Sequence, residues 1–190
     1  MSETTPRIDE LLATAEPGSI VDLPLPGAWV YVPKVHGDER GSFHESFKAE
    51  AFGEKLGYPF EVAQGNLSRS SRDVVRGIHL ADVPPGQAKF VSCLSGAITD
   101  VLVDVRVGSP TFGQHITVEL SAKNNLSVYV PLGVGHGFRA HTDQTTVNYL
   151  VTEAYNPQRE YGIDPFDAEL AVAWGVSKEQ AVCLLYTSPS

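Results

Sequence analysis

The sequence predicts an all-β protein, a sandwich or closed β-barrel of the jelly-roll type with a few short peripheral helices. Short runs rich in β-branched and aromatic residues follow one another at close, even spacing, and Gly, Pro, Asn or Asp separates them. The chain has 190 residues, enough for one domain with a sizeable core and few for two. Hydrophobic residues make up 42% of it and charged residues 19%, as in an ordinary globular protein.

The elements are expected in the following order. Residues 1–26 form an extension ahead of the domain, in which Ile8, Leu11 and Leu12 indicate a short helix before a Pro/Gly stretch. The domain spans residues 27–176. One helix, residues 48–56, has its apolar residues on a single face, and a short helical or irregular segment follows Asp164. The predicted strands cover residues 28–32, 89–93, 97–105, 115–120, 126–130, 137–140 and 145–151.

Residues 177–190 are expected to form an atypical tail. Residues 183–190 read CLLYTSPS and follow no pattern set up earlier in the chain. They resemble translated adapter or vector sequence more than the end of a domain, and they take no part in the fold prediction.

The bulk composition excludes several classes of function. A formal net charge of −9 argues against nucleic-acid binding, which needs a basic surface, although a local arginine cluster could still hold a small anion. No apolar run approaches the roughly 20 residues of a membrane-spanning helix, and the N-terminus lacks a secretory pattern. We therefore expect no membrane association and a cytoplasmic location. Cys93 and Cys183 lie too far apart to suggest a zinc site or a disulfide framework.

Two motifs pair glycine with histidine. One ends at His79, in Arg-Gly-Ile-His, and the other ends at His136, in the form Pro-x-Gly-x-x-His. The second resembles a signature of the cupin superfamily, whose members are jelly-roll barrels that often bind a metal. Here Ala81 stands where a His-x-His pair would need its second histidine, and no Glu occurs between His79 and Glu119. Two histidines alone make a poor metal site, so we expect none.

The surroundings of His79 favour chemistry over a structural role, which is the simpler interpretation for His36, His44, His115 and His141. Lys89 begins an apolar strand, and Arg76 precedes His79 by three residues. A lysine that pointed into a barrel would be costly unless it served an anion. The alternative, that Lys89 faces solvent, stays open at this level.

Six ordered blocks carry a more specific resemblance. They are DERGSFHESF (38–47), QGNLSRSS (64–71), VRGIH (75–79), PPGQAKFVSCLSGAITDVLVDVRVGSPTFG (84–113), PLGVGHGF (131–138) and YNPQREYGI (155–163). Over roughly residues 29–174 the chain resembles the dTDP-4-dehydrorhamnose 3,5-epimerase family. The resemblance implies an epimerase that needs no cofactor and inverts C3 and C5 of a dTDP-4-keto-6-deoxyhexose, on the route to dTDP-L-rhamnose. A mono-epimerase acting at C3 or C5 alone, in an antibiotic-type deoxysugar pathway, is the alternative.

The resemblance also implies the role of each site residue. Epimerisation beside a ketone requires a base, a group that stabilises the enolate and an acid on the far face of the ring. By resemblance, His79 is the base, Asp167 orients and charges it, Lys89 lies beside the enolate oxygen, and Tyr149 is the acid.

Further residues are implied to bind the substrate. Arg40 and Arg76 match positions that hold the diphosphate, for which the planar guanidinium is well suited. Glu45, Gln64 and Asn66 match contacts to the nucleotide or sugar, and His136 matches a second pocket histidine that could equally stabilise its turn. The family is implied to be homodimeric with a shared active site, to which the neighbouring subunit supplies Arg40 and Glu45.

The chain departs from the family pattern at a few places. Leu150 follows Tyr149 where many members carry Lys, Ile78 replaces the commoner Leu, and the helical tail expected after Trp174 is missing or replaced. Two other classes of function stay open. A metal-dependent cupin would reveal itself by elemental analysis, and a non-catalytic sugar-nucleotide binding module would be expected to lack His79 or Tyr149, both of which are present.

Overall fold

The computed structural model of the protein describes residues 7–183, which contain two short helices and fourteen strands. The helices are α1 (Ile8–Ala13) and α2 (Ala49–Leu56). The first strands are β1 (Ile20–Asp22), β2 (Trp29–Tyr31), β3 (His36–Asp38), β4 (Gly41–Phe43), β5 (Gln64–Ser70), β6 (Val74–Ala81) and β7 (Lys89–Ser95). The others are β8 (Ala97–Asp104), β9 (His115–Ser121), β10 (Ser127–Val130), β11 (Val134–Ala140), β12 (Thr145–Val151), β13 (Glu160–Gly162) and β14 (Val182–Cys183).

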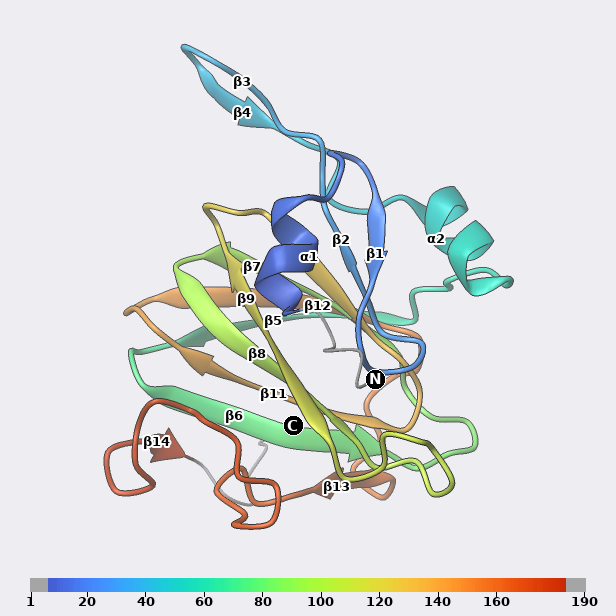
Figure 1. The fold of residues 1–190 in the computed structure, drawn as a ribbon, viewed down its shortest axis with the longest axis vertical. Helices are drawn as coiled ribbons and strands as arrows, with labels where there is room; N and C mark the ends of the chain where they lie inside the picture. The colour runs from blue at the N-terminus through green and yellow to red at the C-terminus, as the bar shows by residue number, and fades with distance from the viewer. Residues whose placement is uncertain (1–6, 184–190) are drawn as a thin grey trace, which may run out of the picture.

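The strands form two packed sheets and one projecting hairpin (Figure 1). The first sheet has the order β1-β2-β10-β7-β12-β5, and every pair in it is antiparallel. The second has the order β13-β6-β11-β8-β9, with β14 added in parallel to β6. The β3–β4 hairpin pairs only with itself among the described residues and extends away from the two sheets. The predicted jelly-roll fold is confirmed.

The main core lies between the two sheets, because alternate residues of each strand point inward. Val30, Val91 and Val128 enter it from the first sheet, and Ile98 and Leu102 enter it from the second. Leu23 and Leu25, from the segment expected to precede the domain, are buried in the same cluster, and β1 joins the first sheet. The residues between these inward-pointing ones lie on the outer face of each sheet, where other elements cover them.

The outer face of each sheet is also covered. On the first sheet, α2 places Phe52 among Trp29, Tyr31 and Phe90, with ring centroids 4.9–5.2 Å apart. The helix ends at Gly57, whose φ of 78° provides the left-handed residue that commonly terminates a helix. On the second sheet, the irregular segment after β13 packs Trp174 and its neighbours on Val101 and Val103 of β8.

The sequence predicted some elements better than others. Strand β12 matches the predicted run, β2 and β7–β11 lie on the other predicted runs, and α2 lies within the predicted helix. Strands β1, β3–β6, β13 and β14 were not predicted, and the segment after Asp164 is irregular. The unusual C-terminal sequence lies outside the described residues from position 184 on. Within residues 7–183, no helix has the length and apolar character needed to cross a membrane.

Candidate active site

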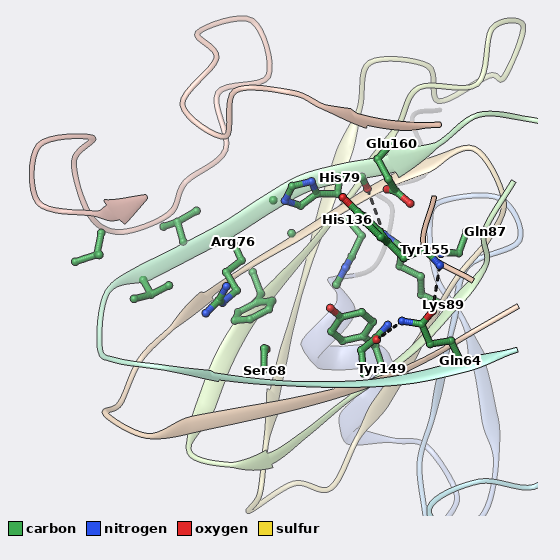
Figure 2. Close-up of a pocket in the computed structure, with 17 residues that line it drawn as sticks. Gln64, Ser68, Arg76, His79, Gln87, Lys89, His136, Tyr149, Tyr155 and Glu160 are labelled. Carbon is green, nitrogen blue, oxygen red and sulfur yellow. Dashed lines mark hydrogen bonds between the residues drawn. The ribbon is translucent and has the colours of Figure 1, made fainter. Parts of the chain in front are cut away.

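A cavity of about 590 Å³ opens between the two sheets, bounded by β5, β7 and β12 on one side and by β6, β11 and β13 on the other (Figure 2). Its size is that of an ordinary small-molecule site. The side chains that line it are mainly polar or aromatic and include Gln64, Asn66, Ser68, Arg76, His79, Gln87, Lys89, His136, Tyr149, Tyr155 and Glu160.

His79 and Tyr149 face this cavity from opposite walls. His79 comes from β6 of the second sheet, and Tyr149 comes from β12 of the first sheet (Figure 2). Surrounding protein lowers the pKa of His79 to about 4, because burial and the positive charges of Lys89, His136 and Arg76 all disfavour the imidazolium. Burial raises the pKa of Tyr149. At neutral pH the cavity therefore holds a neutral imidazole able to accept a proton and, across from it, a phenol that retains one.

Lys89 lines the same cavity with only 6% of its surface exposed, so the solvent-facing alternative is excluded. Its ammonium donates to the carbonyl oxygen of His79 at 3.4 Å. Burial lowers the pKa of Lys89, and the negative charges of Glu160 and Asp100 oppose that shift. A desolvated cation whose hydrogen bond to the described part of the chain is this long is well placed to attract an anion that forms nearby.

His136 lies beside His79, since the two are paired residues of strands β11 and β6. Its Nε2 is 2.7 Å from Oδ1 of Asp100, which is fully buried on β8 behind the cavity wall. Burial raises the pKa of Asp100, while His136 and Lys89 pull it in the other direction. A histidine–carboxylate pair that does not involve His79 therefore supports one wall of the cavity.

Arg76 lines the cavity as an exposed residue, and its Nε donates to Ser70 Oγ at 3.0 Å. Gln64 lies near the other end, with Nε2 2.5 Å from Asn66 Oδ1 and with Oε1 accepting the backbone N–H of Tyr155 at 3.1 Å. These contacts order a guanidinium and two amides at the rim, donors that suit phosphate and base recognition.

Comparison with known proteins identifies the family. The model of the dTDP-4-dehydrorhamnose 3,5-epimerase family matches residues 22–186. The chain belongs to this family. A dTDP-4-dehydrorhamnose 3,5-epimerase of Mycolicibacterium smegmatis is 48% identical over 146 residues, which are 77% of this chain and 73% of the relative. The predicted family, fold and isomerase class are confirmed.

Two solved epimerase structures resemble the chain closely. An epimerase of Mycobacterium tuberculosis superposes with a TM-score of 0.81 at 45% identity, covering 83% of this chain and 79% of the other. A 3′-monoepimerase of Streptomyces bikiniensis, solved in complex with dTDP-quinovose, gives a TM-score of 0.81 at 43% identity, covering 87% and 82%. Epimerases of both kinds, single and double, are therefore among the relatives of this dTDP-sugar epimerase family member.

Two residues implied by the family resemblance lie outside the cavity. Arg40 occupies the tip of the β3–β4 hairpin, where it is exposed and paired with Asp38. Glu45 follows the hairpin and pairs with Lys48 at 3.0 Å. Neither lines the cavity of its own chain. Both residues are exposed. The β3–β4 hairpin that carries Arg40 projects away from the two sheets of this epimerase (Figure 1).

Asp167 does not line the cavity either. Its Oδ1 accepts the backbone N–H groups of Glu169 and Leu170, at 2.8 and 3.1 Å, and so closes a turn. Within residues 7–183 no hydrogen bond or ion pair joins Asp167 to His79. The pairing of Asp167 with His79 stays a prediction.

The epimerase cavity also contains residues that the sequence did not single out. Glu160, Tyr155 and Gln87 line it, and Asp100 supports it from behind. Glu160 and Tyr155 belong to the block at 155–163, and their place in a block that resembles the family could have indicated that they lie at the site. Asp100 interrupts the apolar residues of β8, and a carboxylate at such a position indicates a buried group with a partner. Among the described residues, no three His, Cys, Asp or Glu side chains gather into a possible metal site.

Proposed function

We propose that this protein epimerises dTDP-4-keto-6-deoxy-D-glucose at C3 and C5 by proton transfer between side chains. The observation that carries the proposal is the placement of a neutral His79 and a protonated Tyr149 on opposite walls of one cavity. Inversion of a carbon requires removal of a proton from one face and delivery to the other, and this arrangement suits both steps.

In the proposed reaction, His79 takes the proton from a carbon beside the C4 ketone. The electron pair of the C–H bond moves into the enolate, whose negative charge rests on the C4 oxygen. Lys89 stabilises that charge, because its buried ammonium keeps most of its hydrogen-bonding capacity. Tyr149 then donates its phenolic proton to the opposite face, and exchange with solvent restores both side chains.

Substrate binding in this proposal uses the polar rim. Arg76 is suited to the diphosphate, since its guanidinium remains exposed at the cavity edge while Ser70 fixes its Nε. Gln64 and Asn66 are suited to the nucleotide or sugar. A local cation of this kind reconciles an anionic substrate with a chain of net charge −9. The cytoplasmic location predicted from composition stays part of the proposal.

The number of carbons inverted is tested by solvent exchange. The protein is incubated with dTDP-4-keto-6-deoxyglucose in deuterated water, and the sugar protons are followed by NMR. Loss of both the C3 and the C5 proton signals supports the double epimerase. Exchange at one carbon alone would replace it by the mono-epimerase, and exchange at neither would contradict the proposed activity.

We further propose that two copies of the chain share their active sites through the β3–β4 arm. The exposure of Arg40 at the tip of the projecting hairpin, and of Glu45 just after it, supports this, because an arm that leaves its own barrel can reach the cavity of a second copy. Mixing the Arg40→Ala and His79→Asn variants tests it. In a hybrid dimer, one cavity would combine an intact His79 with the intact Arg40 of the partner.

The expected result is recovery of about one quarter of wild-type activity after random subunit exchange, since half of the dimers are hybrids and each has one complete site. Each variant alone should have little activity at low substrate concentration. If both residues served the cavity of their own chain, every site in the mixture would carry one defect and no activity would be recovered.

A further inference from the structure

A buried carboxylate lies directly behind the wall of the active-site cavity. Asp100 is on β8, has no exposed surface, and is not itself a lining residue. Its Oδ1 is 2.7 Å from Nε2 of His136, which does line the cavity from the neighbouring strand β11. Asp100 can therefore influence a bound molecule through the imidazole of His136.

The buried position of Asp100 does not favour the stability of the fold. Its second oxygen, Oδ2, is buried and has no hydrogen-bond partner among residues 7–183. Desolvation of a carboxylate is costly, and half-satisfied buried ionic groups often contribute less to stability than a neutral replacement would. An unsatisfied buried carboxylate calls for an explanation, and its contact with a cavity residue points to a role in function.

The backbone next to His136 is held independently of Asp100. A Cβ atom on Gly137 would lie 2.7 Å from the carbonyl oxygen of Arg76, so glycine allows β11 to approach β6 closely there. This approach brings His136 beside His79 as its paired residue. The strands thus fix where His136 is, and they leave the orientation of its ring to be set by other contacts.

We propose that Asp100 is a positioning residue for the epimerisation, holding the ring and the tautomer of His136. An ionised carboxylate only accepts hydrogen bonds, so it requires the hydrogen of His136 to be on Nε2. Nδ1 is then the nitrogen left for the substrate, and the ring cannot rotate without losing its contact. The inference rests on the proposed function, because fixing the imidazole of His136 affects catalysis only if that ring contacts the sugar.

A double-mutant cycle separates this role from a structural one. Asp100→Asn, His136→Asn and the double variant are compared with the wild type for turnover of dTDP-4-keto-6-deoxyglucose and for melting temperature. Asp100→Asn should lower kcat by about 10- to 100-fold, by analogy with the loss of the carboxylate that orients a metal-binding histidine. Its melting temperature should be equal to or above that of the wild type, because a buried charge is removed.

The same change in the His136→Asn background should have less than about a twofold further effect on kcat, since Asp100 would have no ring left to position. Glu119→Gln is the matched control. Glu119, on β9, also pairs with a histidine, His141, at 3.3 Å. Neither residue lines the cavity, so turnover should stay at the wild-type value.

Nitrogen-15 NMR of the histidine rings gives a readout that needs no substrate. It should find the hydrogen of His136 on Nε2 in the wild type and lose that preference in Asp100→Asn. Wild-type turnover in Asp100→Asn, equal losses in both backgrounds, or a hydrogen on Nδ1 in the wild type would each overturn the inference. A wild-type protein without epimerase activity would instead contradict the proposed function, and the NMR result would still decide whether Asp100 sets the tautomer.

Discussion

The low pKa of His79 predicts an unusual response to acid. An ordinary histidine has a pKa of 6.5, whereas burial and the charges of Lys89, His136 and Arg76 bring that of His79 to about 4. At about pH 5.5 an ordinary imidazole is roughly one-tenth neutral, while a group with a pKa of about 4 is roughly 97% neutral. Because only the neutral ring accepts a proton, kcat/KM at this pH should stay within about 10% of its neutral value rather than fall about tenfold.

The assay is the initial rate of epimerisation at low substrate concentration from pH 4 to 8, at constant ionic strength. The acid limb of kcat/KM reports the free enzyme and should lie near pH 4, whereas that of kcat reports the complex with substrate. The substrate is an anion, so the limb of kcat should move to higher pH. An acid limb of kcat/KM near pH 6.5 would refute the reasoning, and would indicate that a carboxylate such as Asp167 charges His79 in the working enzyme.

Three substitutions test other parts of the account. Phe52→Ala should lower the free energy of unfolding in urea by about 3–5 kcal/mol, because this fully buried ring contacts several other rings. Val107→Ala is the control: at a 94% exposed position, it should change the free energy of unfolding by less than about 0.5 kcal/mol. Arg76→Gln should weaken dTDP binding about 10- to 100-fold in calorimetry, and Arg72→Gln, outside the cavity, should not. Asp167→Asn keeps the oxygen that closes its turn, so the melting temperature should not change. If Asp167 has its predicted catalytic role, kcat should fall at least about tenfold. A wild-type kcat would leave Asp167 as a turn residue.

Two of the strands that the sequence failed to predict, β5 and β6, line the site. Every second residue of β5 faces the cavity, and these residues are the polar Gln64, Asn66 and Ser68. The strand therefore lacks the alternation of apolar and polar residues by which a strand is predicted. Strand β6 contains Arg76, Gly77 and His79, which interrupt its apolar residues for the same reason. Strands β7, β8 and β12 pack on the core and keep the β-branched pattern that identifies a strand.

The site residues divide in a similar way. The sequence did not show whether Lys89 points inward, because both faces of β7 are largely buried. Such a strand lacks the alternation of apolar and polar residues that would separate an inner face from a solvent-facing one. Asp100 could have been suspected from its place in an apolar strand, but its partner His136 is 36 residues away along the chain. Arg40 and Glu45 belong to an arm whose proposed role depends on a second copy, which a single sequence does not describe.

The most direct test of the opposite-wall arrangement compares His79→Asn and Tyr149→Phe in deuterated water. With the base removed, neither exchange of a ring proton nor epimerised product should be detected, although dTDP should still bind. With the acid removed, His79 should still exchange the first proton with solvent while the yield of inverted product falls strongly. Unchanged turnover in Tyr149→Phe, or exchange that survives in His79→Asn, would contradict the account.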